Sequence, residues 1–170
     1  MANGSITERK LAAGAVTPTK LSGVPTVRAY NSAAQVIADS TGTTLGFDSE
    51  RWDVGSMHNV FVNNGRLNAP IAGVYDVTAN VTWAATPTGG SRATALIKVP
   101  LLGSPVPVAR QTVDAAGWPS TTEQTISTQV LLPAGAAIRL SVRQSSGATL
   151  AVLNSPEVSP EIAMTWIVPG

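Results

Sequence analysis

The sequence has no cysteine and only one histidine among its 170 residues. Without cysteine the chain has neither a disulfide framework nor thiolate chemistry. A single histidine, His58, cannot build the histidine-rich sites of zinc or non-haem iron enzymes. It also lies beside Asn59 rather than at a metal-ligand spacing. We therefore predict no metal, no cofactor, and a structural or surface role for His58.

Charged residues are scarce too, at 12% of the chain against about 25% in typical globular domains. Either Ser, Thr, Asn and Gln side chains carry the surface, or other subunits cover part of it, and we expect both. The formal net charge of +1 gives no field that would attract nucleic acid or anionic lipid. We therefore expect no nucleic-acid partner.

Long apolar runs are also missing. No segment approaches the ~20 apolar residues of a membrane span. The N-terminal sequence MANGSITERK lacks the apolar core of a secretory signal. We expect a protein without a membrane span that is made in a cytoplasm.

Catalytic patterns are weak. Ser, His and Asp are all present, but no Gly-x-Ser-x-Gly elbow accompanies them. The densest acidic cluster is Asp48, Glu50 and Asp53. Paired carboxylates can cleave sugars or ligate calcium, but this spacing matches no loop motif. We predict a solvated loop here, no catalytic residues, and a protein that is not an enzyme.

What the sequence does contain is a long alternating stretch from residue 68 to residue 83. A period of two is typical of a strand with one buried face. Pro70 lacks an amide donor and belongs before the paired strand, and Gly73 suits the point where the strand begins. The side chains that share the apolar face are Tyr75, Val77, Ala79, Val81 and Trp83.

Shorter alternating segments follow the same pattern on both sides of this stretch. We predict strands at 26–31, 35–38, 43–47, 93–99, 108–113, 125–132, 138–142, 150–153 and 162–168. Segment 50–62 is the least legible, and no long helical period occurs after Pro25. Eight to ten strands with closely spaced turns indicate an all-β antiparallel sandwich or jelly roll.

The second faces of several strands carry no charge. In the last strand this face is Ala163, Thr165 and Ile167, and Leu131 and Leu153 lie on the second faces of their strands. A monomeric sandwich would place more polar groups there. We therefore predict a subunit interface that includes Leu131, Leu153, Thr165 and Ile167.

Two of the four tryptophans, Trp83 and Trp166, follow the apolar phase of their strands and are predicted to lie in the core. Trp118 precedes Pro119 in a loop and is the best candidate for an exposed ligand contact. Arg139 and Arg143 share one strand face, where we expect local salt bridges because the overall charge is nearly balanced.

The N-terminal segment contains an internal repeat. I-T-x-x-K-L at residues 6–11 returns as V-T-x-x-K-L at residues 16–21. Copies this short cannot bury their apolar residues alone, so these need sister copies or another protein. The alternative is a mobile tail with chance periodicity. We divide the chain into a stalk, residues 1–25, and a head, residues 26–170.

The turn and strand at 69–75 (APIAGVY) resemble a motif of the jelly roll shared by the complement globular head and tumour necrosis factor (TNF). The pairing of 130–135 with 138–142 and the terminal aromatic strand 164–167 are similar to that family as well. The resemblance covers residues 26–169 and implies an antiparallel TNF-like jelly roll. Tyr75 matches the family tyrosine, and its place in the core or at a threefold contact stays open.

The repeat I-T-x-x-K-L-x-x-G resembles stalk repeats of bacteriophage fibre and head-decoration proteins, and segment 50–58 is similar to phage modules. This resemblance implies a homotrimer with an N-terminal foot fixed to the virion. The foot would contact a major capsid protein or other virion protein through apolar side chains: Ile6, Leu11, Val16 and Leu21. Secreted relatives carry collagen repeats and a signal segment, which this sequence lacks.

These sequence patterns are compatible with three candidate functions. The leading one is a structural virion protein, a trimeric capsid decoration or head fibre on the virion surface. The second is a tail-fibre tip that binds a host surface glycan. The third is an enzyme such as a polysaccharide depolymerase, which no acid–base pattern supports.

Overall fold

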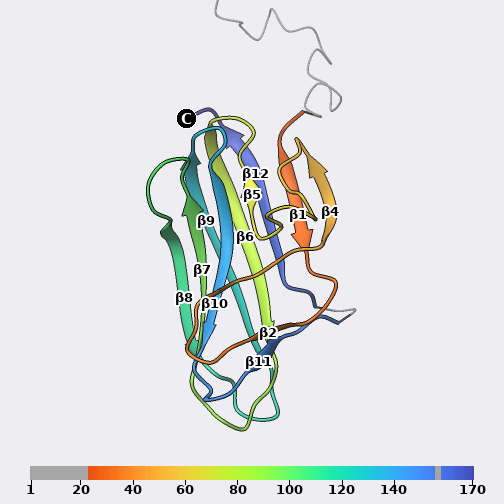
Figure 1. The fold of residues 1–170 in the computed structure, drawn as a ribbon, viewed down its shortest axis with the longest axis vertical. Helices are drawn as coiled ribbons and strands as arrows, with labels where there is room; N and C mark the ends of the chain where they lie inside the picture. Colours follow the sequence, from red (N-terminus) through yellow and green to blue (C-terminus); the bar gives the residue numbers. More distant parts are fainter. Residues whose placement is uncertain (1–22, 156–157) are drawn as a thin grey trace, which may run out of the picture.

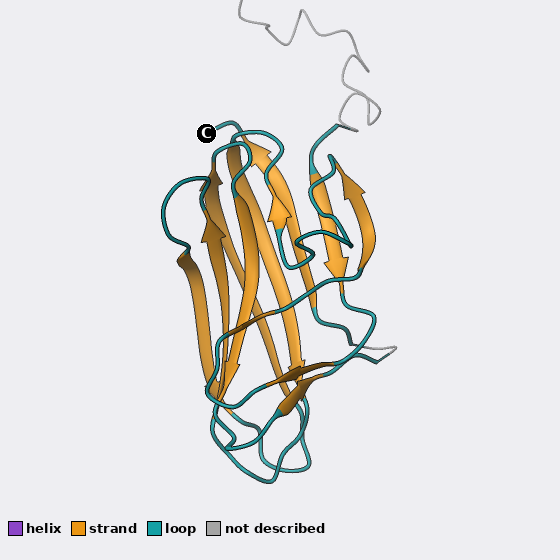
Figure 2. Cartoon of the chain, in the orientation of Figure 1, coloured by secondary structure: helices purple, strands orange, loops and turns teal. Residues whose placement is uncertain are grey.

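A computed structural model describes residues 23–155 and 158–170, which form twelve strands and no helix (Figure 2). The all-β prediction is therefore confirmed. The strands are β1 (Thr26–Tyr30), β2 (Gln35–Ile37), β3 (Thr43–Thr44), β4 (Ser49–Val54), β5 (Leu67–Asn68), β6 (Gly73–Trp83), β7 (Ser91–Val99), β8 (Val106–Asp114), β9 (Thr122–Leu132), β10 (Ala137–Gln144), β11 (Leu150–Val152) and β12 (Glu161–Val168).

The strands form two sheets that pack face to face (Figure 1). One sheet has seven strands in the order β2-β11-β6-β12-β1-β4, with β9 on the other edge of β6, and is called the β6 sheet below. The other has the order β3-β10-β7-β8, with β5 also paired to β10. All of these strand pairs are antiparallel. The arrangement is the antiparallel jelly roll expected from the sequence.

Strand β6 is the centre of its sheet. Its side chains alternate between buried and more exposed along the whole strand, so one face contributes to the core and the other lies outside. It pairs with β9 from Gly73 to Trp83, and its second edge pairs with β12 and β11. Tyr75 is fully buried, and its hydroxyl donates to the Ile71 carbonyl at 2.7 Å. The open question about Tyr75 is thus decided in favour of the core.

Strand β7 buries the face that carries Leu96 rather than the one that carries Ile97. Thr94 lies on this buried face and is satisfied because its hydroxyl donates to Gln124 Oε1 at 2.8 Å. The indole of Trp83, buried as predicted, donates to the same oxygen at 2.9 Å. One amide from β9 therefore satisfies two buried donors and lets β7 place polar side chains in the core.

The predicted solvated loop at the acidic cluster holds for Asp48, which is exposed before β4, but is wrong for Glu50 and Asp53. Glu50 and Asp53 belong to β4, which pairs with β1 at the edge of the β6 sheet. Asp53 accepts hydrogen bonds from the backbone amides of Met57 and His58 at 2.9 and 3.0 Å. Its carboxylate caps the turn after β4 instead of facing solvent.

His58 has the structural role expected for it. The side chain is buried, with Nδ1 2.8 Å from Glu50 Oε1 and Nε2 2.9 Å from the Asn64 carbonyl oxygen. These contacts tie the segment after β4 to the strand itself and hold Met57, which is fully buried, in the core. The sequence did not show this because its pattern of charges resembles that of a loop.

The core predicts how two leucine variants differ. Leu96 is fully buried, whereas Leu102 is 91% exposed. Leu96→Ala should lower the free energy of unfolding by about 2–5 kcal/mol because it leaves a cavity. Leu102→Ala, the same change at the surface, should alter it by no more than about 0.5 kcal/mol. Urea unfolding followed by tryptophan fluorescence measures both, and equal losses would contradict this description of the core.

Candidate functional site

The feature of the fold best suited to contact another molecule is the outer face of the β6 sheet. It is formed by the side chains that point away from the core on β4, β1, β12, β6 and β9. From β6 it receives Val74, Asp76, Thr78, Asn80 and Thr82, all half-buried or exposed. No helix or strand of the described residues covers this face (Figure 1).

One end of the outer face is apolar. Val74 pairs with Leu131 of β9 on one side and with Val168 of β12 on the other. Leu131 is 55% exposed, Ile167 40% and Val168 47%. The bulge of β12 lies so close to Gly73 that a Cβ there would clash with the Trp166 indole nitrogen, so only glycine fits. Large aliphatic side chains are thus exposed to solvent at the end of the sheet where β6 begins.

Three of the four predicted interface residues lie on or beside this end. Leu131 and Ile167 are exposed there, and Thr165 is half-buried and shares a 2.8 Å hydrogen bond with the Thr26 hydroxyl. Leu153 follows β11 at the opposite end of the sheet, where its amide donates to the Thr82 carbonyl at 2.8 Å. The predicted stalk contacts Ile6, Leu11, Val16 and Leu21 lie outside the described residues.

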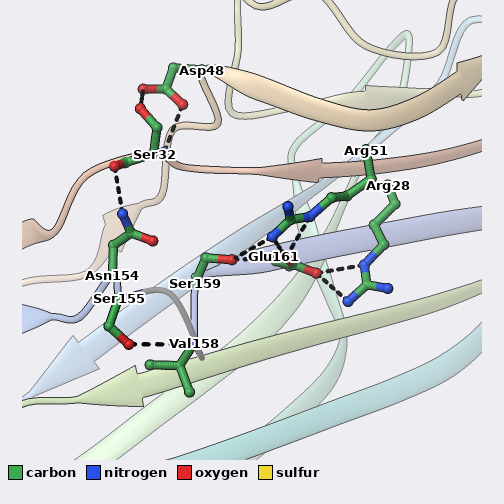
Figure 3. A network of polar contacts seen from close by, with 9 residues as sticks. All are labelled: Arg28, Ser32, Asp48, Arg51, Asn154, Ser155, Val158, Ser159 and Glu161. Carbon is green, nitrogen blue, oxygen red and sulfur yellow. Dashed lines mark hydrogen bonds and ion pairs between the residues drawn. The ribbon is translucent and has the colours of Figure 1, made fainter.

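The other end of the outer face carries a charged cluster, in which one carboxylate lies between two guanidinium groups (Figure 3). Glu161 of β12 is paired with Arg28 of β1 through Oε2 and with Arg51 of β4 through Oε1, the latter at 2.8 Å. Ser159 adds a hydroxyl donor to Oε1 at 2.8 Å. The Arg51 guanidinium also stacks 4.1 Å from the Tyr30 ring centroid. The cluster fixes β12, β1 and β4 to one another across the sheet.

Burial alone would raise the pKa of the Glu161 carboxyl. Hydrogen bonds from Arg51, Ser159 and Arg28 outweigh that effect, and the pKa lies below its ordinary value of 4.5. Glu161 is thus a nearly buried but ionised group, which is the state that two cationic partners stabilise.

Sequence reasoning did not identify this cluster and predicted ion pairs elsewhere. Among the described residues, neither Arg139 nor Arg143 forms a salt bridge; Arg143 instead donates to the Ser40 carbonyl at 3.0 Å. A signal for the true cluster was present, since Arg28 alternates with buried Val27 and must point outward. Its partner Glu161 is 133 residues away, a separation that periodicity cannot bridge.

The remaining candidate is Trp118, which is 64% exposed in the loop between β8 and β9. This loop lies at the opposite end of the sandwich from the start of β1 (Figure 1). Trp166, predicted to lie in the core, is half-buried and packs against it. Trp118 is therefore placed to meet a ligand, and Trp166 to support the sheet.

Within residues 23–155 and 158–170 we find no group of three or more metal-ligating side chains. No helix in that part of the chain is long and apolar enough to cross a membrane. The prediction that the protein is not an enzyme stays a prediction. What the outer face offers chemically is apolar contact at one end and charge-assisted hydrogen bonds at the other.

The Glu161 cluster makes stability depend on pH. Because the folded pKa lies below the ordinary value, the ion pairs stabilise the fold fully above pH 4.5 and are lost as the pH falls through the lowered value. Glu161→Gln should therefore lower the free energy of unfolding by about 2 kcal/mol at neutral pH, and the deficit should shrink as the solution is acidified below 4.5. Asp114→Asn, an exposed control on β8, should stay within about 0.5 kcal/mol of wild type. Urea unfolding across the pH range tests this, and a Glu161→Gln deficit that does not depend on pH would contradict it.

Comparison with known proteins identifies the fold. No protein-family model matches the sequence, and no curated protein matches it significantly. Among solved structures, Eiger TNF from S. frugiperda has a TM-score of 0.62 at 11% identity, covering 87% of this chain and 95% of that one. Murine APRIL has a TM-score of 0.63 at 12% identity, covering 85% and 99%. The globular domain of zebrafish complement 1qA has a TM-score of 0.57 at 10% identity, covering 86% and 99%. The likeness shows the fold alone: the chain is a jelly roll of the TNF and complement globular-head type.

Proposed function

We propose that this chain is a structural protein of a bacteriophage virion. In this proposal three copies pack through the outer faces of their β6 sheets, and their N-terminal segments fix the trimer to the particle surface as a capsid decoration or head fibre. The observation that carries the self-association is the uncovered apolar end of the outer face, formed by Leu131, Ile167 and Val168. The phage assignment rests on the resemblance of the N-terminal repeat to phage stalk repeats.

The energetics indicate how much of the face must be covered. Fully burying a large aliphatic side chain contributes about 1.5–3 kcal/mol, so each half-exposed side chain gains roughly 1 kcal/mol. Association costs about 4–15 kcal/mol for each copy added. The nine such side chains of a trimer contribute roughly 9 kcal/mol, which offsets two such costs only at the bottom of that range. The interface therefore has to include the middle of the face, where Ala163 and Thr165 of β12 pair with Thr78 and Asp76 of β6.

The proposed attachment uses the N-terminal segments together. The described chain begins at the same end of the sandwich as the apolar end of the outer face (Figure 1). Three stalks would then leave a trimer side by side, with Ile6, Leu11, Val16 and Leu21 of each available to a capsid protein. Three weak contacts acting together give strong retention through their high effective concentration.

A tail-fibre tip that binds a host surface glycan is the second candidate. It is favoured by one observation, the exposed indole of Trp118 in the loop between β8 and β9. This loop lies at the end of the sandwich opposite the start of β1 (Figure 1). An exposed aromatic ring can stack on a sugar. This candidate shares the trimer and differs in its place on the virion.

Self-association is tested by molar mass. The wild-type protein should have about three times the 17.4 kDa mass of one chain in light scattering. Leu131→Asp should dissociate it, because a carboxylate would be buried without a partner. Leu102→Asp, at a residue that is 91% exposed in the loop between β7 and β8 and outside the β6 sheet, is the matched control and should stay trimeric. A wild-type mass of 17.4 kDa would refute the proposal.

Attachment is tested by deleting residues 1–24. The truncated head should stay folded and trimeric by circular dichroism and light scattering, because all twelve strands lie beyond the deletion. It should no longer bind particles that lack the protein, as measured by co-sedimentation. If it still decorated the capsid, the attachment site would lie in the jelly roll, and immunogold label on the tail would favour the fibre-tip candidate.

A further inference from the structure

A groove crosses the charged end of the outer face. It consists of two adjoining hollows of about 320 and 260 Å³ that share Arg28, Asn80 and Glu161. Its floor follows one row of paired residues across the sheet, in which Glu161 of β12 lies between Tyr30 of β1 and Asn80 of β6. Asn80 in turn accepts a 2.9 Å hydrogen bond from Thr125 of β9. The groove therefore runs across the strands, from the β4 edge of the sheet to its β9 edge.

The β4 side of the groove carries a surplus of positive charge. Arg28 and Arg51 share the single carboxylate of Glu161, and each uses only its Nε and Nη2 atoms in contacts with described residues. A guanidinium group has five N–H donors. The two side chains are 41% and 47% exposed, so their remaining donors can reach a second acceptor.

The β9 side of the groove is acidic. Glu123 lines the larger hollow and is exposed, and it forms no ion pair with any described residue. Neighbouring strands are about 4.8 Å apart, so β9 lies roughly 14 Å from β1 across β12 and β6. This exceeds the Debye length of about 8 Å at physiological ionic strength. Within the described chain no ion pair joins the two ends of the groove.

We propose that the groove sets the register between neighbouring copies of this chain, with the Arg28–Arg51 end of one copy binding Glu123 of the next. The inference rests on the self-association proposed above and adds the polar contacts that direct it. A free anion would satisfy only the basic end. A second copy of the same face presents both charges, and in a closed ring every basic end and every acidic end has a partner.

The test compares three variants with the same fold. Glu123 has no ion-pair partner within its own described chain, so changing it leaves the Glu161 cluster intact. Glu123→Arg should weaken the trimer at least roughly tenfold in analytical ultracentrifugation, because it places like charges opposite each other. Glu123→Asp keeps the charge and should remain near wild type. Asp114→Arg makes the same change in charge outside the groove and should have no effect.

The outcomes separate the two proposals. A wild-type monomer refutes the self-association itself. A wild-type trimer that is equally stable with Glu123→Arg, or equally weakened by Asp114→Arg, leaves self-association standing and overturns the groove contact. Binding of sialyllactose, a carboxylate sugar, to the intact trimer and its loss in Arg28→Gln would assign the basic end to an acidic glycan and also overturn the inference.

Discussion

The structure depends on the unbroken pairing of β6 with β9. Eleven consecutive residues from Gly73 to Trp83 each face a partner on β9, and a slip by one residue would turn every side chain to the opposite face. This register places Tyr75 and Trp83 in the core and Val74 and Asn80 outside. Both the core and the outer face of the β6 sheet follow from that single constraint.

The outer face has two ends with different physical properties. At one end Leu131, Ile167 and Val168 expose apolar surface that no other part of the described chain covers. At the other, Glu161 is nearly buried and is ionised because Arg28 and Arg51 surround it. Apolar contact supplies affinity without direction, whereas paired charges impose an orientation. A face with both properties suits contact with a partner of defined geometry, which in the proposal made above is a second copy of the chain.

The likeness to TNF and complement domains concerns the arrangement of strands, at 10–12% identity. Fold alone does not give function, so the proposed virion role depends on features of this chain. These are the N-terminal repeat, the low proportion of charge and the uncovered sheet face. The proposed self-association involves only this outer face, so it can be tested on the head without the N-terminal segment.

The fold class and the central strand follow from the sequence alone, because alternation with a period of two is a local property of the chain. The exposure of Trp118 was expected from its place before Pro119 in a loop. The sequence also indicated that Leu131 and Ile167 point away from the core. The tertiary structure decided that Leu96 rather than Ile97 faces the core, since Thr94 beside it is satisfied by Gln124 of another strand. It likewise decided that Glu50 and Asp53 lie in a paired strand, and that Arg28 and Arg51 meet Glu161. Those contacts join residues that are up to 133 positions apart, and only the packing of the strands brings them together.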